Sequence, residues 1–310
     1  MLKQRVITAL ILMAILLPAL AVQAVWPFAA LSLLFVSAAG WEWARLNGWP
    51  GLRAWLLGGV VALVSLTAAQ MVHLDPWGIG PGAQDMAGVA AAHVHEPGHL
   101  LAGFVVPALV WWVTAGLWAL GGAWALRFGT AHWKHLPPAL RAFLGLGILV
   151  MAWLALIESK GQGLNFLLSL FCLVWAADIG AYFGGRAFGR RKLALSISPG
   201  KSWEGVWSGM LAVVILAVIW IAVDRHWSVD SPSIYSHLLS GLGPVGLVVS
   251  LAFLAGMSVV GDLFESLIKR QAGAKDSSQL LPGHGGVLDR IDALLPILPW
   301  VLALMTLCHA

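Results

Sequence analysis

Residues 261–292 bring acidic and basic side chains together in a chain that is otherwise strongly apolar. Nine charged residues fall in this stretch, although the whole chain has only 18 Lys and Arg and 14 Asp and Glu. Asp262 directly follows the apolar run LAGMSVVG, at a depth where a charge is costly and usually belongs to a functional site. On a helix, Glu265, Ser266 and Lys269 would share the face of Asp262. We expect Glu265 and Lys269 to form an ordinary ion pair on a solvated helix end, and Asp262 to be functional.

The second half of the stretch has residues that could bind an anion and a hard cation. Gly283, Gly285 and Gly286 allow backbone shapes that point N–H groups at an anion. Mg²⁺ is usually held by one or two carboxylates together with substrate phosphates, and Asp262 with Asp289 would supply such a pair. Four basic side chains could neutralise phosphate oxygens, namely Lys269, Arg270, Lys275 and Arg290. From the residues alone, a helix cap at Asp289 followed by a mixed surface loop is an equally good interpretation.

The composition of the chain indicates which kind of secondary structure must position these residues. The 310 residues are 60% hydrophobic and 10% charged, with a mean hydropathy of +0.86, whereas a soluble domain carries about 25% charged residues. The chain is therefore predicted to be an all-α polytopic integral membrane protein, which excludes one or two soluble domains. Cys172 and Cys308 lie in apolar segments and are interpreted as small hydrophobic residues, without a disulfide framework.

About nine transmembrane helices are predicted, because a span needs about 20 predominantly apolar residues. The expected spans are 6–23, 25–44, 54–72, 100–126, 140–157, 163–183, 204–223, 241–260 and 291–309. No repeat or linker divides the chain, so we expect a single membrane domain over residues 1–310, with N-terminal helices in 1–157 and a catalytic C-terminal part in 163–310. The first span also resembles a signal peptide, but a retained helix is preferred because a second apolar span follows at once.

The distribution of Lys and Arg predicts the orientation in the membrane. With the N-terminus in the cytoplasm, sixteen of the 18 basic residues fall in cytoplasmic segments, and only Lys160 and Arg225 lie outside. Cytoplasmic loops carry such an excess of Lys and Arg, so the C-terminus is expected outside. Residues 261–292 and the basic loop 184–203 are then both cytoplasmic.

The charged stretch resembles the signature of a known enzyme family. Its pattern S-x-x-K-R, K-D and P-G-H-G-G-V-x-D-R-x-D, from Ser266 to Asp292, is similar to that of the phosphatidate cytidylyltransferases, also called CDP-diacylglycerol synthases. The resemblance extends to WEWARL at 41–46, to DIGAYFGGRAFGRRKL at 178–193 and to SPGKSWEG at 198–205. The family usually has a basic residue and a threonine where this chain has Gly200 and Ser202.

This resemblance implies a reaction in which the phosphate of phosphatidic acid attacks the α-phosphorus of CTP. Pyrophosphate leaves, and CDP-diacylglycerol is formed for phospholipid synthesis. Asp262 and Asp289 would bind the catalytic Mg²⁺, with Mn²⁺ as a substitute and a monovalent ion such as K⁺ beside it. The resemblance also implies a homodimer in a bacterial-type inner (plasma) membrane, with the active site facing the cytoplasm, and no nucleic-acid partner is expected.

The matched blocks also supply the candidate substrate contacts. Lys201 of SPGKS is predicted to act in catalysis with Asp262 and Asp289, and a P-loop is excluded because Leu195 stands where that motif needs glycine. The predicted substrate-binding residues are Ser198, Ser202, Arg186, Ser266, Lys269, Arg270, Lys275, His284, Gly285, Gly286 and Arg290. For Arg186, anchoring of a cytoplasmic loop is an alternative, and His284 is equally well a structural loop residue.

Asp292 and Asp178 are further candidate metal ligands. Asp292 lies one helical turn after Asp289, and Asp178 lies late in the sixth predicted span, where pairing with Arg186 is the alternative. A separate group, His93, His95 and His99 in HVHEPGH, has spacing that could bind Zn²⁺ or Cu²⁺, although a solvated loop is the preferred interpretation.

Two other functions compete with lipid cytidylyl transfer. A related CTP-dependent lipid kinase would use similar substrates, but it is expected to lack so complete a PGHGGVLDRID block. An ion-coupled transporter would place acids near the midplane and often shows duplicated halves. In this chain the acids gather at the cytoplasmic ends of spans, and no duplication is seen.

Overall fold

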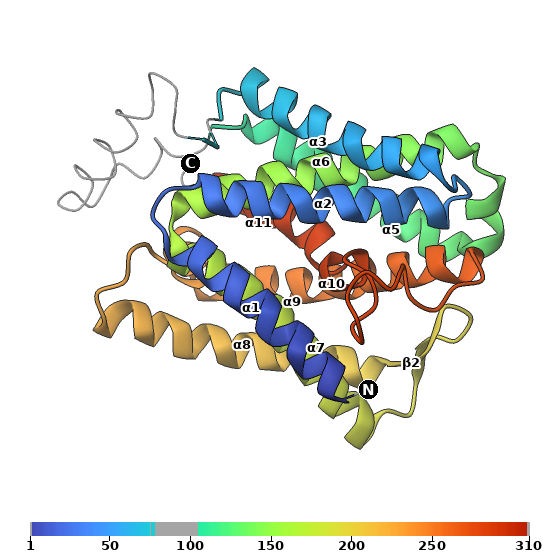
Figure 1. Ribbon diagram of the computed structural model, residues 1–310. Helices are drawn as coiled ribbons and strands as arrows, with labels where there is room; N and C mark the ends of the chain where they lie inside the picture. The colour runs from blue at the N-terminus through green and yellow to red at the C-terminus, as the bar shows by residue number, and fades with distance from the viewer. Residues whose placement is uncertain (1, 75, 78–104, 309–310) are drawn as a thin grey trace.

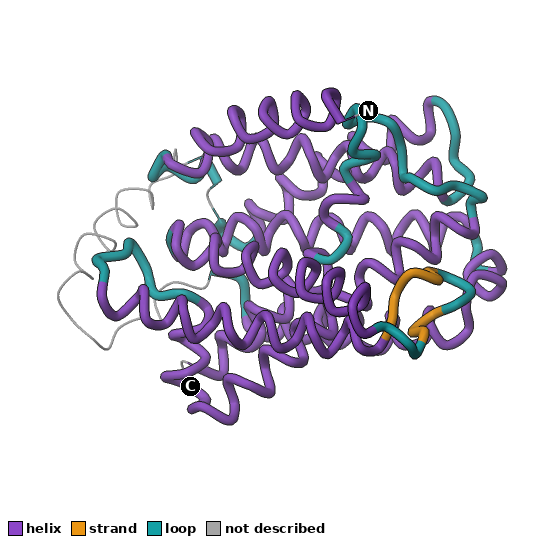
Figure 2. The backbone as a smooth tube through the Cα atoms, turned by 90° about the horizontal axis from the view of Figure 1, so that it is seen from below, coloured by secondary structure: helices purple, strands orange, loops and turns teal. Residues whose placement is uncertain are grey.

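The computed structural model describes residues 2–74, 76–77 and 105–308 of the chain. Long helices lie side by side, with a small hairpin at the edge (Figures 1 and 2). The helices are α1 (Leu2–Ala21), α2 (Trp26–Leu46), α3 (Leu52–Met71), α5 (Ala108–His135), α6 (Pro138–Gln162), α7 (Leu164–Phe188), α8 (Trp203–His226), α9 (Ile234–Gln271), α10 (Leu288–Ile291) and α11 (Leu294–Cys308). The architecture agrees with the predicted helical membrane protein.

Seven helical stretches in the described part of the chain are long and apolar enough to cross a membrane. They are α3, residues 108–130 of α5, α6, α7, α8, α9 and the segment Leu288–Cys308. Helix α1 contains a shorter apolar helix, Val6–Ala21, and α2 is 21 residues long. The count of nine and the sides of the two termini therefore stay predictions. His93, His95 and His99, and the start of the predicted span 100–126, lie outside the described residues.

Helix α9 is much longer than the predicted span 241–260, and its extension carries the charged residues. It covers 38 residues and turns sharply at Gly243, whose φ of 69° lies in the left-handed region that glycine adopts without steric cost. Beyond this kink the helix continues through Asp262, Glu265 and Lys269, so their predicted helical placement is confirmed.

The last predicted span, 291–309, is divided in the structure. Helix α10 is a single turn that contains Asp289, and α11 starts only after Asp292. Figure 1 shows α10 in the middle of the bundle, where it contacts α2 and α9. Asp289 and Asp292 therefore lie at an irregular, interior turn at the start of the stretch Leu288–Cys308.

An aromatic cluster fixes α9 against α2 and α5. The ring of Phe264 packs edge-on against Trp118 and Trp133, with ring centroids 5.4 and 5.2 Å apart. Trp43 of α2, which is 1% exposed, lies 6.1 Å from the same ring. Edge-to-face pairs of this kind contribute stability beyond the apolar area that they bury. Because Phe264 follows Asp262 by two residues, the cluster holds the charged turns of α9 in a fixed position.

Helices α7 and α8 approach each other through glycines. A Cβ atom at Gly180 would lie 2.6 Å from the Cβ of Ala212, and one at Gly209 would lie 2.7 Å from the carbonyl oxygen of Ala177. Both separations are shorter than atoms tolerate, so only glycine permits this spacing. Small residues allow membrane helices to pack closely, and here they fix the two helices that flank the hairpin.

The hairpin is formed by β1 (Lys192–Ala194) and β2 (Ser198–Ser202), which pair antiparallel. It departs from the predicted all-α fold, because strands of three and five residues are too short to show the alternation of a strand. Ser202 ends the hairpin and caps α8, since its hydroxyl accepts a hydrogen bond from the N–H of Gly205 at 3.2 Å. The hairpin thus fixes Lys201 at the start of α8.

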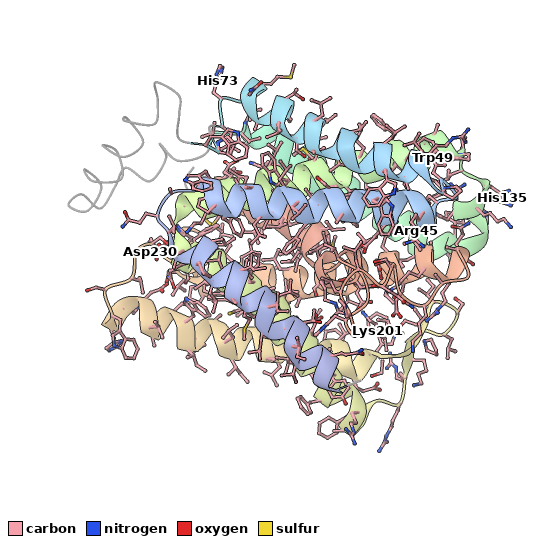
Figure 3. The ribbon with its side chains drawn as sticks, viewed as in Figure 1. Arg45, Trp49, His73, His135, Lys201 and Asp230 are labelled. Atoms are coloured by element: carbon pink, nitrogen blue, oxygen red, sulfur yellow. The ribbon has the colours of Figure 1, made fainter. Side chains whose placement is uncertain are left out.

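The predicted site residues gather at one end of the bundle. Figure 3 shows Arg45, Trp49, His135 and Lys201 at this end and His73 and Asp230 at the other. The hairpin and the connection between α9 and α10 lie at the same end as Lys201 (Figure 1). The two segments that carry the predicted site therefore meet in the fold.

Replacing Gly209 with alanine should separate α7 from α8. The new Cβ would press on the backbone carbonyl of Ala177, and overpacking of this kind costs about 1–3 kcal/mol. We expect a lower apparent melting temperature of the detergent-solubilised protein. Gly147→Ala in α6 is the matched control, since a Cβ at Gly147 meets nothing within 4 Å. Equal melting temperatures for the two variants would contradict the close packing of α7 and α8.

Candidate active site

An ion pair joins the hairpin to α9. Lys201 Nζ lies 2.6 Å from Asp262 Oδ2, and the two side chains are 26% and 33% exposed. Ser266, one turn further along α9, donates its hydroxyl to Asp262 Oδ1 at 3.3 Å. Three predicted site residues from two distant segments are therefore brought together, and the ion pair is accessible to a ligand.

Two more acids surround this ion pair. A Cβ atom at Gly261 would overlap the carbonyl oxygen of Asp292, so glycine is what allows α9 to approach that turn. Asp292 consequently interacts electrostatically with Asp262 and Lys201. Asp178, an exposed residue of α7, interacts with the same two side chains. The group around Lys201 thus contains three acids, from α7, α9 and the turn before α11.

Lys269 is the centre of a second charged group. Its Nζ lies 2.6 Å from Asp289 Oδ1 and also pairs with Glu265. The other oxygen of Asp289 accepts hydrogen bonds from the N–H and the hydroxyl of Ser277, both at 2.9 Å, and from the N–H of Gly286 at 2.8 Å. The predicted pair of Glu265 and Lys269 is confirmed. The predicted solvated helix end is wrong, because Glu265 is only 2% exposed inside the bundle.

Glu42 of α2 is a candidate site residue that the sequence analysis missed. Its side chain is 0% exposed, yet its two oxygens accept hydrogen bonds from the hydroxyls of Ser277 and Ser278 and from the N–H groups of Val287 and Leu288. An acid near the end of an apolar span is the same signal that identified Asp262. Its partners, 235 to 246 residues further along the chain, left no signal in the sequence.

Other predicted substrate contacts serve the fold in this structure. Arg270 Nε donates to the carbonyl oxygen of Ile197 in the hairpin at 3.4 Å, which ties the end of α9 to that loop. Arg186 donates to the Tyr182 hydroxyl at 3.4 Å and does not pair with Asp178. The hydroxyl of Ser202 is buried and committed to the cap of α8.

The remaining predicted contacts have no side-chain partner among the described residues. Lys275 and Arg290 are exposed cations, and the hydroxyl of Ser198 is unbonded within the described part of the chain. His284 has a buried Nδ1 atom with no hydrogen-bond partner there. Gly285 has a φ of 88°, which turns the chain within PGHGG. The side chains of Lys275, Arg290, Ser198 and His284 can therefore still bond to a ligand, whereas the N–H and carbonyl of Gly285 are bonded to Leu281.

The donor chemistry around Asp262 fits a magnesium ion better than that around Asp289. No three His, Cys, Asp or Glu side chains of the described residues are placed to share one metal ion. Mg²⁺, however, needs only one or two carboxylates when substrate phosphates complete its coordination. Asp262 is accessible and has Asp292 and Asp178 as acidic neighbours. Both oxygens of Asp289 are bonded already, so this residue could bind a metal only if Lys269 leaves it.

A cavity of about 860 Å³ opens beside the second charged group. It is lined by Trp41 and Arg45 of α2, by Ala272 and by residues 274–280, which include Lys275 and one acid, Asp276. Since Ser277 also donates to Asp289, the cavity reaches the neighbourhood of that carboxylate. Its basic side chains suit an anionic ligand.

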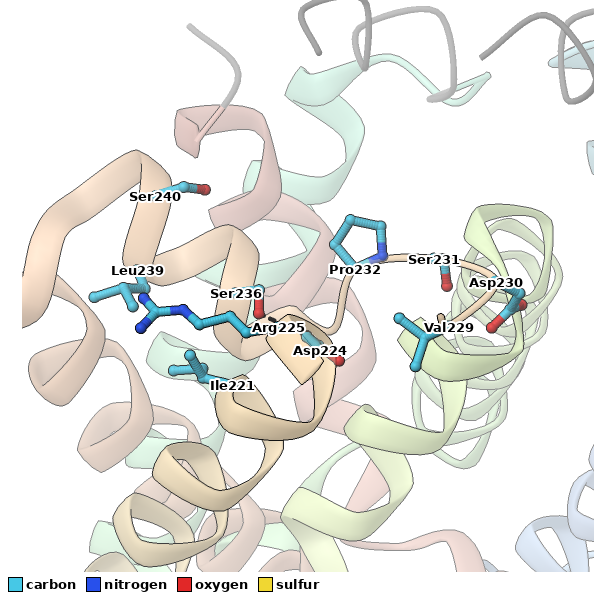
Figure 4. Close-up of a pocket in the computed structure, with 10 residues that line it drawn as sticks. All are labelled: Ile221, Asp224, Arg225, Val229, Asp230, Ser231, Pro232, Ser236, Leu239 and Ser240. Carbon is cyan, nitrogen blue, oxygen red and sulfur yellow. Dashed lines mark hydrogen bonds between the residues drawn. The ribbon is translucent and has the colours of Figure 1, made fainter. Parts of the chain in front are cut away.

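A second cavity, of about 460 Å³, lies at the opposite end of the bundle between α8 and α9 (Figure 4). Asp224 there accepts hydrogen bonds from Ser233 and Ser236, and Asp230 accepts them from the first N–H groups of α7. These acids tie helix ends together and are not available to a ligand. Neither cavity is lined by Lys201 or Asp262.

The fold and the charged groups define a class of protein, namely a polytopic helical membrane protein with lysine–carboxylate pairs at one end of its bundle. Comparison with known proteins is more specific. The sequence pattern of the cytidylyltransferase family matches residues 3–308, and the chain belongs to this family.

Two relatives are similar over nearly their whole length. The phosphatidate cytidylyltransferase of Pseudomonas aeruginosa is 39% identical over 307 residues, which cover 98% of this chain and 97% of that protein. The phosphatidate cytidylyltransferase of Haemophilus influenzae is 38% identical over 314 residues, covering 97% of each chain. The phosphatidate cytidylyltransferase of Brucella suis is 43% identical over 132 residues, or 43% of each chain. The family resemblance seen in the sequence is therefore confirmed.

Replacing Lys269 with methionine should strongly destabilise the protein. The change leaves Glu265 and Asp289, whose side chains are 3% and 6% exposed, without their shared cation, and breaking a buried ion pair costs about 3–5 kcal/mol. We expect a marked fall in the apparent melting temperature in detergent. The exposed Lys275→Met is the control, and adding Glu265→Gln to Lys269→Met should recover part of the loss. Equal melting temperatures for Lys269→Met and Lys275→Met would contradict this assignment.

Proposed function

We propose that the protein transfers the cytidylyl group of CTP to phosphatidic acid, giving CDP-diacylglycerol and pyrophosphate. Membership in the cytidylyltransferase family and the printed names of relatives that match nearly the whole chain support this reaction. The structural observation that carries the proposal is the convergence of Lys201 with Asp262 and of Lys269 with Asp289 at one end of α9. Cations and carboxylates side by side suit a reaction in which charge on phosphate oxygens must be both held and neutralised.

The two lysines would contact phosphate oxygens of CTP. Lys201 is partly exposed at the end of the hairpin, where a ligand phosphate could replace the Asp262 carboxylate as its partner. Lys269 is less exposed, at 14%, and is held by two acids. The attacking phosphate of the lipid is ionised near pH 7, so the proposed reaction needs no strong base. Positioning and charge neutralisation are then the main tasks of the side chains.

Asp262 is the first proposed ligand of Mg²⁺, with Asp289, Asp292 and Asp178 as further candidates. When bound, Mg²⁺ would polarise the phosphate being attacked and offset the charge on the leaving pyrophosphate. The excess of carboxylates over lysines around Asp262 supports this assignment. Mn²⁺ as a substitute and a neighbouring K⁺ are proposals from the family resemblance.

The cavity beside Ser277 is a proposed approach for CTP. Arg45 and Lys275 at its rim could attract the triphosphate, and Lys275 belongs to the signature. The lipid substrate is expected to reach the site from the bilayer, because its acyl chains cannot leave the hydrocarbon region without a large cost. We further propose the bacterial-type inner membrane, a cytoplasmic active site and a homodimer.

Asp262→Asn and Asp289→Asn are each expected to reduce CDP-lipid formation at least about a hundredfold. Each change removes a negative charge that the proposed site uses for metal binding or for lysine positioning. The measurement is the formation of labelled CDP-diacylglycerol from labelled CTP and phosphatidic acid by purified protein in mixed micelles with Mg²⁺. Asp230→Asn is the control, since Asp230 is an exposed acid at the opposite end of the bundle.

Three results would count against this proposal. Full activity of both variants would remove the assigned roles. Absence of CDP-lipid with the unaltered protein and Mg²⁺ would overturn the reaction itself. Transfer of the terminal phosphate of CTP, with CDP released, would identify a lipid kinase.

Single cysteines should test the proposed orientation. Ser196 at the tip of the hairpin and Ser228 between α8 and α9 are both exposed and lie at opposite ends of the bundle. In a background with Cys172→Ala and Cys308→Ala, we expect a membrane-impermeant maleimide to label Ser228→Cys in intact spheroplasts. Ser196→Cys should be labelled only after the membrane is opened. The reverse pattern would refute a cytoplasmic active site.

A further inference from the structure

The most completely buried acid near the site, Glu42, belongs to none of the ion pairs. It lies on α2, and its side chain is 0% exposed. Oε1 accepts the Ser278 hydroxyl at 2.5 Å and the Val287 N–H at 3.0 Å, and Oε2 accepts the Leu288 N–H at 2.7 Å and the Ser277 hydroxyl at 3.2 Å. All four donors belong to the connection between α9 and α11. One side chain of α2 thus binds two separate parts of the signature loop, the segment 272–287 between α9 and α10, together with the first residue of α10.

The partners of Glu42 are neutral, so hydrogen bonds alone must stabilise its buried charge. Within the described residues no Lys, Arg or His forms an ion pair with it. A buried charge is tolerated only when hydrogen bonds replace its hydration. Here the Ser278 hydroxyl and two N–H groups supply them, and the Ser277 hydroxyl is shared between Glu42 and Asp289. A glutamine in the same place has one acceptor oxygen and an amide that is itself a donor. It cannot satisfy four donors that converge from two sides.

Ser277 connects this buried carboxylate to Asp289. Its hydroxyl lies within hydrogen-bond distance of both Glu42 Oε2, at 3.2 Å, and Asp289 Oδ2, at 2.9 Å. Gly286 reinforces the connection, because its N–H donates to Asp289 and a Cβ there would overlap Glu42 and Ser277. The signature loop is therefore packed between two carboxylates, one on α2 and one on α10.

We propose that Glu42 is a positioning residue that sets the place of Asp289 through Ser277 and the backbone of residues 286–288. It touches no substrate. It fixes the loop so that Asp289 keeps its orientation beside Lys269, and loss of the carboxylate lets the loop move. This inference rests on the proposed role of Asp289 in the active site.

Glu42→Gln is expected to lower kcat at least about tenfold, which corresponds to about 1.4 kcal/mol in the barrier. KM for CTP should change less than about threefold, since Lys201 and Lys269, the two lysines proposed to contact CTP, lie outside the loop. Activity is measured well below the melting temperature and normalised to the folded fraction, so that reduced stability alone cannot lower kcat.

Glu158→Gln is the matched control for loss of a buried acid. Glu158 is 2% exposed on α6. Helices α2 and α6 run antiparallel, because Trp43 Nε1 donates to Arg141 while Trp153 Nε1 donates to Ala29. Glu158 therefore lies at the far end of the bundle from Glu42. Its substitution also removes a buried acid, but it should leave kcat of the folded protein unchanged.

A double-mutant cycle separates positioning from a merely structural role. Ser277→Ala should lower kcat by itself, but it should add less than about twofold to Glu42→Gln, because the link to Asp289 is already broken. Unchanged kcat in Glu42→Gln, an equal loss in Glu158→Gln, or fully additive effects of the two loop changes would each overturn the proposal.

Asp289→Asn, measured in parallel, distinguishes a failure of the positioning role of Glu42 from a failure of the active-site role of Asp289. If it is inactive while Glu42→Gln is fully active, only the positioning role fails. If Asp289→Asn is fully active, the assignment of Asp289 fails, and the positioning role fails with it.

Discussion

A buried carboxylate must be surrounded by donors, and the arrangement of this site depends on how that requirement is met for Glu42. Its four hydrogen bonds use the two serines at one end of the signature loop and two N–H groups at the other. The N–H groups that open α10 are thereby satisfied, as the first N–H groups of any helix must be. The short turn that carries Asp289 would otherwise have little to hold it, since four residues cannot form a stable helix alone.

The acids of the ion pairs are also bonded to cations or donors, and they differ in how deeply they are buried. Glu265 is buried and depends on Lys269, and Asp289 combines Lys269 with three hydrogen bonds. Asp262 is more exposed and has only Lys201 and a weak contact from Ser266. The inner carboxylates are fully committed, whereas the outer ones keep capacity for a ligand. This gradient favours Asp262 as the group that meets metal and phosphate, and it gives the inner acids the task of holding the loop.

Sequence patterns identified the helical membrane fold because a long apolar run can satisfy its backbone hydrogen bonds in few other structures. They also identified Asp262, whose cost in an apolar run requires an explanation. The burial of Glu265 was not predictable, because helical spacing gives its neighbour Lys269 but not the helices that cover both. The hairpin was missed because its strands are short, and Glu42 because its partners lie more than 230 residues away. In each case the missing information is tertiary packing and not local preference.

The exposed Asp178 indicates how a site of this kind can serve both a lipid and a nucleotide. It lies on a face of α7 that also exposes Ile179, Tyr182 and Phe183, and an acid facing hydrocarbon alone would be very costly. It interacts electrostatically with Lys201 and Asp262, so this face of α7 borders the outer ion pair. Thr8 of α1 donates to the carbonyl oxygen of Pro282 in the signature loop. The apolar helix α1 therefore contacts the same loop that lines the cavity of about 860 Å³ through Ala272 and residues 274–280. The signature loop therefore lies between an apolar helix and a cavity, an arrangement suited to joining a lipid to a nucleotide.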